Sequence, residues 1–284
     1  MMSLPCVVVL VLAGVGHATS ESRRYIDLTH DLDKDAVFWP GVPSLNLTNL
    51  QKGRMPGGFW LEYNVFSVGE HGGTHMDAPA HFSENGWHTS DIPLHRLMGP
   101  GVVVDISERA KNNPDAQLTV EDLQKWEEMY GKIPSNAWVL LNSGWTKKWK
   151  DRAAFFGSDN TEDSSTFHFP SISGDAARWL WENRPYITGV GLDTASIDSG
   201  PSREYPAHRA LLPNRRIGLE NVANLDQLPP AGAMIYAIPL KLKDGTGGPM
   251  RLFAVVGDGS SCAAAFRLNL MFVVSLYLAY LFLR

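Results

Sequence analysis

Short apolar runs recur along the chain, and most have the composition of β-strands. They are rich in β-branched and aromatic residues and are bounded by Gly, Pro, Asn or Asp, which predicts strands. The runs cover 25–28, 61–68, 102–106, 137–142, 187–193, 233–240 and 251–256. In one of them, Leu61 and Tyr63 alternate with more polar neighbours such as Glu62, which predicts a strand with one more polar face.

Two other segments carry helical signals. Residues 119–131 begin with Thr119 as a candidate N-cap and end at Gly131. Residues 173–184 begin with Ser173 as a candidate cap and stop before a proline. Strands and helices are therefore mixed along the chain, and no long Gly/Pro/Ser-rich linker divides it. The sequence predicts a single α/β domain with a mixed sheet.

Both ends of the chain are apolar. The run Val7–Val15 and the small residues up to Ala18 follow the pattern of a signal peptide. The tail Leu268–Arg284 follows a run of small residues, which indicates a GPI-anchor signal or, alternatively, a C-terminal membrane span. We expect a protein of the secretory pathway, attached to the outer face of a membrane through its tail. The expected segments are a signal peptide at 1–18, one domain at 19–257 and the tail at 258–284.

Composition and charge restrict the classes of partner. The net charge is −5 and no basic stripe is present, which argues against nucleic acid. Both cysteines, Cys6 and Cys262, lie in or beside the end segments, so the domain must be held by its own core. Asn46 begins an Asn-Leu-Thr sequon, which predicts a glycosylated surface loop in a secreted protein.

The strongest chemical signal is EHGGTHMDAPAHF, residues 70–82. It places His71, His75, Asp77 and His81 within eleven positions. Because two glycines and a proline lie among them, a helix is unfavourable, and we expect a loop followed by a short strand. If the segment after His75 is extended, Asp77 and His81 point to the same side.

These residue types suit a catalytic metal site. Imidazole and carboxylate ligands without thiolate favour zinc, manganese or ferrous iron. Three ligands, His71, His75 and Asp77, leave a coordination position for water, whose pKa a metal lowers. His81 could then transfer protons, because an unperturbed histidine has a pKa of about 6.5. The alternative is a chance cluster of structural or surface histidines.

The motif resembles H-x-G-T-H-x-D-x-P-x-H of the cyclase family, which includes bacterial kynurenine formamidases and isatin hydrolases. Four further segments resemble family segments in the same order: YIDLTHDL (25–32), FWPG (38–41), GLDTASID (191–198) and GLENVANLDQLPPAGA (218–233). The resemblance implies a swivelling β/β/α domain. It also implies a homo-oligomer, a dimer or tetramer, in which neighbouring subunits complete the site.

The resemblance also implies a ligand set. His71, His75 and Asp77 would hold a first metal, and Asp77 would bridge to a second metal bound by His208 and Glu220. Glu220 would reach both ions. The implied metal is zinc or manganese, with one or two ions per subunit. Since an unpaired buried Glu is costly, the alternative for Glu220 is an ion pair with a nearby arginine, Arg209, Arg215 or Arg216.

The implied activity is hydrolysis of an aryl amide, with His81 as proton donor and acceptor and Trp39 as a substrate contact. The expected substrate is N-formyl-kynurenine, cleaved to kynurenine and formate; the alternative is isatin, opened to isatinate. A catalytically inactive surface binding protein and a metal-storage protein are the non-enzyme alternatives. Five aromatic residues near the motifs in sequence are expected to form a wall for the substrate ring: Phe38, Trp39, Phe59, Trp60 and Trp87.

Overall fold

The computed structural model describes residues 23–257, and Arg24–Val256 form one compact unit. The expected signal peptide at 1–18 and the expected tail at 258–284 lie outside the described residues. Within the described part of the chain, no helix has both the length and the apolar character needed to cross a membrane.

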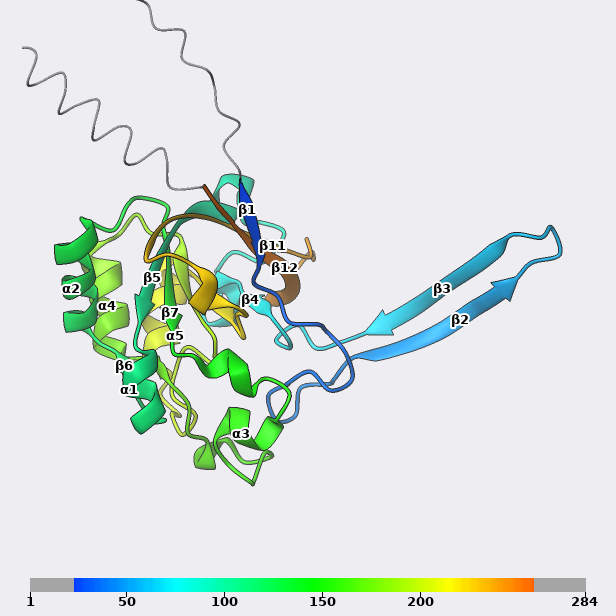
Figure 1. Ribbon diagram of the computed structural model, residues 1–284, viewed down its shortest axis with the longest axis horizontal. Helices are drawn as coiled ribbons and strands as arrows, with labels where there is room; N and C mark the ends of the chain where they lie inside the picture. The colour runs from blue at the N-terminus through cyan, green and yellow to red at the C-terminus, as the bar shows by residue number, and fades with distance from the viewer. Residues whose placement is uncertain (1–22, 258–284) are drawn as a thin grey trace, which may run out of the picture. The chain divides into compact units, whose positions relative to one another are not determined.

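The core of the fold is a mixed sheet that closes on itself (Figure 1). Its order in the described residues is β1-β12-β11-β5-β7-β9-β10-β4, and β12 also pairs with β4. Strands β5, β7, β9 and β10 are parallel to one another, and the remaining pairs are antiparallel. The strands are β1 (Arg24–Asp27), β4 (His75–Asp77), β5 (Met98–Asp105), β7 (Trp138–Asn142), β9 (Gly189–Leu192), β10 (Ile217–Glu220), β11 (Ala231–Pro239) and β12 (Gly247–Val256).

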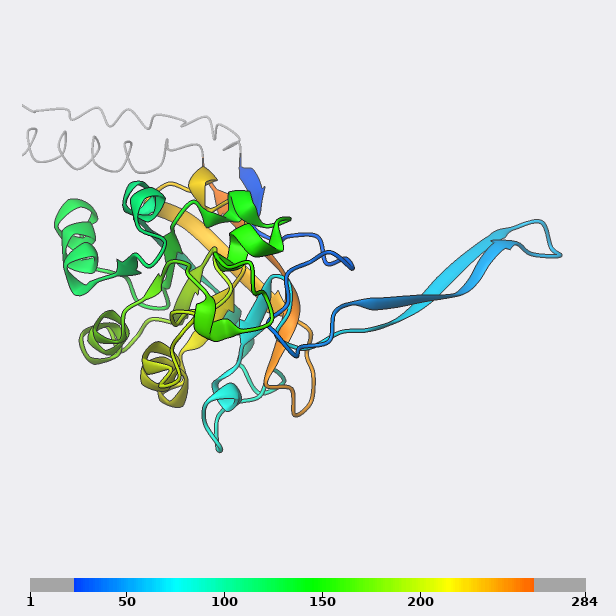
Figure 2. The same ribbon diagram turned by 90° about the horizontal axis from the view of Figure 1, so that it is seen from below.

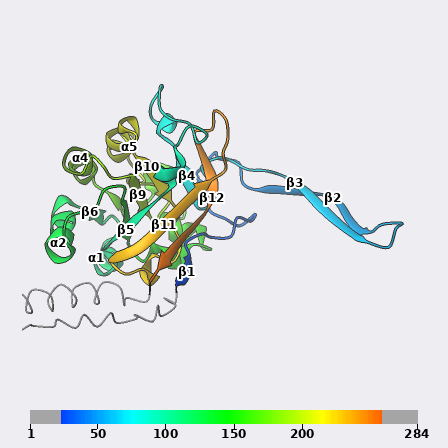
Figure 3. The ribbon, with the colours of Figure 1, turned by 90° about the horizontal axis from the view of Figure 1, so that it is seen from above.

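Helices pack along one side of this sheet, as Figures 1 and 3 show for α2 and α4. The helices are α1 (Ser107–Asn112), α2 (Val120–Tyr130), α3 (Arg152–Phe156), α4 (Gly174–Asn183) and α5 (Pro206–Leu211). Short 3-10 turns complete them: Pro79–His81, Leu94–Leu97, Trp145–Lys148, Ser164–Thr166, Leu212–Asn214 and Leu225–Gln227. The expected mixture of helices and strands is confirmed.

Both faces of the central strands are buried. In β7, Val139 and Leu141 belong to the cluster that contains Leu123 of α2 and Leu180 of α4. Their neighbours along the strand, such as Leu140, belong to a second cluster with residues of β10, β11 and β12. Since side chains alternate along a strand, the first cluster lies between sheet and helices and the second lies inside the closed sheet. The two clusters thus bury both faces of the central strands.

The seven predicted strands and both predicted helices are present. Thr119 caps α2 in a capping box with Asp122, and α2 ends at Gly131, whose φ is +90°. Ser173 caps α4 by accepting the N–H of Ala176 at 3.1 Å. Helices α1, α3 and α5 were not predicted because five or six residues are too few for a helical period to show.

A second, two-stranded sheet forms a long hairpin of β2 (Asn46–Arg54) and β3 (Trp60–Ser67). It extends away from the closed sheet in both Figure 1 and Figure 2. The predicted strand 61–68 is therefore correct in position, and both of its faces are exposed. A third small sheet pairs β6 (Gln117–Leu118) with β8 (Ser171–Ile172).

Candidate metal centre

The expected loop and short strand are present, and the strand's pairing brings a distant carboxylate to the motif. His75 and Asp77 are the first and last residues of β4, which pairs antiparallel with β10. In this register Glu220 lies directly opposite His75, although the two residues are 145 positions apart. The strand pairing therefore explains why the final residue of β10 reaches the histidine motif.

Asp77 fits between its neighbouring strands because both residues opposite it are glycines. Gly218 of β10 and Gly247 of β12 are its partners. A Cβ on Gly218 would lie 3.0 Å from Oδ2 of Asp77, and one on Gly247 would lie 2.5 Å from Cε1 of His71. The site thus depends on two positions without side chains.

The two glycines of the motif shape the loop that carries His71. Gly73 has a φ of +62°, a conformation that other residues rarely adopt. Gly72 forms an isolated bridge with Phe38, and a Cβ at Gly72 would lie 2.0 Å from the Phe38 ring. The loop therefore turns back so that His71 and His75 meet at one point, with ring centroids 5.4 Å apart.

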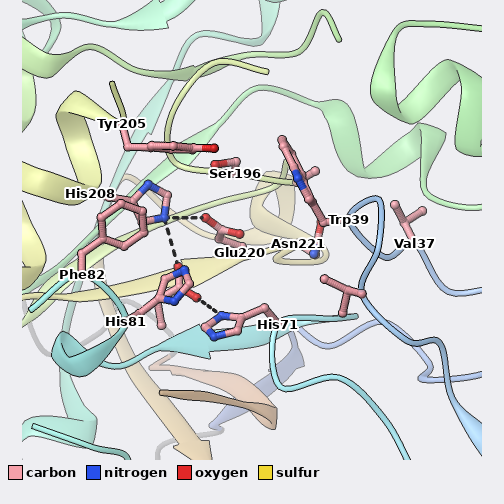
Figure 4. A pocket seen from close by; sticks show the side chains of 13 residues that line it. Val37, Trp39, His71, His81, Phe82, Ser196, Tyr205, His208, Glu220 and Asn221 are labelled. Carbon is pink, nitrogen blue, oxygen red and sulfur yellow. Dashed lines mark hydrogen bonds and ion pairs between the residues drawn. The ribbon is translucent and has the colours of Figure 1, made fainter. Parts of the chain in front are cut away.

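Helix α5 supplies the fourth predicted ligand, His208, whose ring faces Glu220 (Figure 4). Its Nε2 is 3.5 Å from Oδ2 of Asp77 and 3.5 Å from Oε1 of Glu220. On the other side, Nε2 of His75 is 3.3 Å from Asp77 Oδ1 and 3.4 Å from Glu220 Oε2. His71 contributes Nδ1, which is 2.7 Å from Oδ1 of Asp77. The structure thus brings all five predicted ligands together.

Hydrogen bonds fix the tautomers of two histidines, His75 of β4 and His208 of α5. Nδ1 of His75 lies 3.0 Å from the carbonyl oxygen of Gly73, and Nδ1 of His208 lies 2.7 Å from Oδ2 of Asp198. Since these partners only accept, Nδ1 of each ring carries the proton. Nε2 of each ring is then the nitrogen that faces the carboxylates and is available to a metal, as in metal-bound histidines.

His71 is held in the other tautomer. Its Nε2 is 3.0 Å from Oγ1 of Thr246, and that hydroxyl donates its only proton to Oε2 of Glu70 at 2.7 Å. The backbone N–H of Thr246 donates to the same Glu70 oxygen at 2.9 Å. Nε2 of His71 must therefore be the donor to Thr246, which leaves Nδ1 as the ring nitrogen that faces Asp77. Sequence reasoning did not identify Glu70, Thr246 or Asp198.

These donors fit a divalent metal. Nε2 of His75 and Oδ2 of Asp77 are buried and have no hydrogen-bond partner in the described structure. Burial would lower the pKa of His75, but the nearby carboxylates of Asp77 and Glu220 raise it to about 9. The two buried carboxylates therefore favour positive charge between them, which a metal cation supplies.

The candidate donors among the described residues fall into two groups. One group that can surround an ion contains His75, Asp77 and Glu220, and another contains His71, Asp77 and His81. Asp77 belongs to both groups, as expected for a bridging carboxylate. The second group includes His81, which the sequence assigned to proton transfer rather than to the metal.

His81 reaches the site from a 3-10 turn, so the expectation that it continues the extended strand is wrong. Pro79–His81 form that turn, because Pro79 fixes the backbone at its start. The His81 ring stacks on His71 with centroids 4.0 Å apart and is exposed to the pocket. Desolvation in the cavity lowers the pKa of His81, and the opposing charge of Asp77 does not offset it. The ring is therefore neutral near pH 7 and can accept a proton.

Four of the five candidate metal donors, all except the buried His75, line one side of a cavity of about 380 Å³. Trp39 lines it too, and its ring is held edge-on by Phe156, Phe167 and Phe169 at centroid distances of 5.4–6.3 Å. The remaining lining residues are Val37, Val42, Phe82, Ala195, Ser196, Tyr205 and Asn221. None of these described lining residues is Lys or Arg.

The predicted aromatic wall is correct only for Trp39. Phe59 and Trp60 are exposed at the far end of the hairpin. Phe38 is buried in the aromatic cluster, and Trp87 packs against the core inside the closed sheet. Nearness in sequence did not give nearness in space, because the β2–β3 hairpin carries residues 46–67 away from the pocket.

The ion-pair alternative for Glu220 is wrong. Arg216 donates to the carbonyl oxygens of Asn214 and Pro185, and Arg209 pairs with Glu204 at 3.3 Å. Oε1 of Glu220 instead accepts the N–H of Ile197 at 2.9 Å.

Comparisons with known proteins agree with this geometry. The Cyclase family model matches residues 26–199. An isatin hydrolase of Roseibium aggregatum is 33% identical over 227 residues, covering 77% of this chain and 84% of the relative. A kynurenine formamidase of Salinibacter ruber is 27% identical over 233 residues, covering 82% of this chain and 97% of the relative. The solved structure of isatin hydrolase A from Labrenzia aggregata, bound to benzyl benzoate, is similar to this chain with a TM-score of 0.76 and 35% sequence identity. The match covers 83% of this chain and 94% of that structure. The predicted family and fold are confirmed.

The expected localisation at the cell surface is contradicted, and we withdraw it. The matched relatives are named as isatin hydrolase and kynurenine formamidase, and residues 23–257 contain no helix able to cross a membrane. The two end segments that suggested secretion lie outside the described residues. Asn46 is exposed at the start of β2, but its glycosylation required the secretory route, and we do not propose it.

Proposed function

Because the chain belongs to the cyclase family, we propose that it opens a small cyclic aryl amide, with isatin as substrate and isatinate as product. The family relationship makes the chain a metal-dependent hydrolase of carbon–nitrogen bonds other than peptide bonds, acting on small molecules. N-formyl-kynurenine, the substrate expected first from the sequence, is the second candidate.

One observation carries this proposal: five metal donors converge on one side of a cavity whose other walls are mainly apolar or aromatic. About 380 Å³ is the size of pocket that holds a small organic molecule. Val37, Val42 and Phe82 offer apolar surface to a flat ring, and Trp39 offers an aromatic one. With the ring against these apolar walls, its amide bond can face the side of the pocket where the metal donors lie.

The chain's own residues can perform hydrolysis in this arrangement. A divalent metal held by the five donors would polarise the amide carbonyl and lower the pKa of water. His81 is neutral and faces the pocket, so it takes the proton from the attacking water and passes it to the leaving nitrogen. Trp39, fixed by three phenylalanines, holds the ring of the substrate. His71, stacked on His81, keeps that ring in position.

The choice of isatin before N-formyl-kynurenine reverses the order expected from the sequence. N-formyl-kynurenine carries an ammonium and a carboxylate on its side chain, and these charges need partners when they leave water. No described residue that lines the pocket is Lys or Arg, so no side chain of the described lining offers the carboxylate a positive charge. The neutral, compact isatin needs none. The relative named isatin hydrolase is also the more similar of the two compared.

The test is a substrate panel assayed with the purified protein, loaded with zinc in one sample and manganese in another. We expect isatin to be opened with a kcat/KM at least tenfold above that for N-formyl-kynurenine. A kcat/KM for N-formyl-kynurenine tenfold above that for isatin would favour the second candidate, a kynurenine formamidase. Stoichiometric metal binding without turnover of either compound would contradict the enzyme proposal and favour a binding protein.

We also propose that the chain forms a homo-oligomer through the β2–β3 hairpin. A monomer would leave a set of large apolar side chains in water, each at least half exposed: Leu47, Leu50, Phe59, Trp60, Tyr63, Val65 and Phe66. Contiguous apolar surface of this kind usually marks a protein interface. A second copy is the partner that the family resemblance implies.

Light scattering after size exclusion should give at least a dimer. A variant with both Phe66→Ser and Val65→Ser should shift toward the monomer. A monomeric parent protein would contradict this.

A further inference from the structure

One wall of the pocket carries two hydroxyl groups that donate to no described residue. Tyr205 and Ser196 both line the cavity, and Figure 4 shows the Tyr205 hydroxyl directed across it toward Ser196, above Glu220. The Tyr205 hydroxyl takes part in no hydrogen bond within residues 23–257. Oγ of Ser196 accepts the N–H of Asp198 at 3.3 Å, so its own proton is still free to donate. Two donors therefore face the same space.

The backbone holds Tyr205 in this position at some conformational cost. Tyr205 has a φ of 46° and a ψ of 53°, in the left-handed region that residues with a Cβ rarely adopt. It directly precedes Pro206, the first residue of α5. Its N–H donates to Oγ of Ser202 at 3.1 Å, and its carbonyl accepts the N–H of Arg209 at 2.9 Å. Uncommon backbone conformations of non-glycine residues concentrate at functional sites.

The ring of Tyr205 is also fixed by its neighbours. Its centroid lies 5.5 Å from that of Phe82 and 6.1 Å from that of the metal donor His208. Phe82 in turn stacks on His208 at 4.5 Å. The hydroxyl is therefore held at a set distance from the metal donors, which is what orientation of a substrate requires.

The character of these donors limits what they can bind. Both are neutral, and the described residues that line the pocket include no Lys or Arg. A carboxylate at this wall would exchange its hydration for neutral donors alone, whereas a carbonyl oxygen needs only hydrogen-bond donors. The donors lie on a different wall from His81, which handles the proton of the scissile amide.

We propose that Tyr205 and Ser196 donate hydrogen bonds to a second carbonyl oxygen of the substrate. The site then selects aryl amides with a carbonyl group on the ring, ortho to the amide nitrogen. This inference rests on the proposed function, because it assumes that an aryl amide occupies the pocket. In isatin the second carbonyl is the ring ketone. Tyr205 and Ser196 set which amides are cleaved, and the metal donors with His81 cleave them.

The test compares two formamides that differ only in this carbonyl. 2-Formamidoacetophenone carries the ortho carbonyl and formanilide lacks it. We expect Tyr205→Phe to lower kcat/KM for 2-formamidoacetophenone, and for isatin, by about threefold to tenfold, the usual loss for one neutral hydrogen bond. Formanilide should change by less than twofold. Ser196→Ala should act in the same direction. Equal losses on both formamides, or no loss on either, would overturn the inference.

If the protein hydrolyses none of these amides, binding of two smaller aryl amines tests the same inference. Should the metal-loaded protein cleave none of the three amides, the proposed function is wrong, and titration calorimetry replaces the assay. The probes are then 2-aminoacetophenone and aniline, which differ by the same carbonyl. Tyr205→Phe should weaken the first by threefold to tenfold and leave the second unchanged. Equal affinity of the parent protein for both probes would contradict a carbonyl-binding wall.

Discussion

Nδ1 of His208 lies 2.7 Å from Oδ2 of Asp198, and this contact directs the other ring nitrogen at Asp77 and Glu220. The same carboxylate accepts the backbone N–H groups of Ala207 at 2.8 Å and of His208 at 3.1 Å. Asp198 thus fixes the start of α5 and the orientation of the ligand that α5 carries.

Replacing Asp198 by Asn should weaken metal binding while leaving every ligand in place. Loss of such an outer partner typically lowers metal affinity by about 10–100-fold. Competition with a fluorescent zinc chelator measures this directly. The control is Asp175→Asn, an exposed acidic residue on α4. An unchanged affinity in the Asp198 variant would mean that His208 is not a ligand.

His81→Ala separates proton transfer from metal binding. We expect the metal content to be retained and kcat to fall by about 10²–10⁴-fold, the usual contribution of a general acid–base group. His88→Ala, a partly exposed histidine outside the pocket, is the control. Because His81 also falls within a group that can surround an ion, loss of metal in the His81 variant would reassign it as a ligand.

Two adjacent glycines offer a matched pair for testing the packing around Asp77. In Gly247→Ala the new Cβ would lie 2.5 Å from His71 and 2.6 Å from the carbonyl oxygen of Met76, whereas at Gly248 the nearest atom is 3.8 Å away. We expect Gly247→Ala to cost about 1–3 kcal/mol of stability and to reduce bound metal. Gly248→Ala should change stability by less than about 0.5 kcal/mol. Equal effects in urea unfolding would contradict this packing.

Glu127 should make part of the stability depend on acid pH. Burial would raise its pKa, but hydrogen bonds from Arg184, Lys132 and the N–H of Ile133 lower it to about 2. Since the folded pKa lies below the unfolded value of about 4.5, this stability is present above pH 4.5 and is lost as the pH falls toward 2. Thermal melts of the parent and Glu127→Gln should differ by several degrees at pH 7 and converge as the pH falls through about 2. A constant gap would show that the charge of Glu127 is not responsible.

The part of the site that lies in one segment could be predicted from the sequence. His71, His75 and Asp77 fall within seven residues, and their types alone indicate a metal. His208 and Glu220 came only from the family resemblance, because they reach the motif through strand pairing and helix packing across more than 120 positions. Such contacts leave no local pattern.

The fold shows the same division. Long periodic segments such as α2 were predicted with their caps, whereas α5 has six residues and is preceded by a tyrosine in a left-handed conformation. Strand β2 was missed because its sequence, NLTNLQKGR, is mostly polar. Alternation in β3 predicted one more polar face, but such a pattern only separates two faces and does not say what covers them.

Metal removal and return tests the central claim most directly. The protein is stripped with a chelator, dialysed, and titrated with zinc or manganese while isatin opening and bound metal are measured on the same samples. We expect no turnover in the stripped protein and recovery in proportion to bound metal. His208→Ala and Glu220→Ala, each lacking one distant ligand, should bind less metal and recover less activity. Full turnover by the stripped protein, or full recovery in both variants, would contradict a metal centre built from these residues.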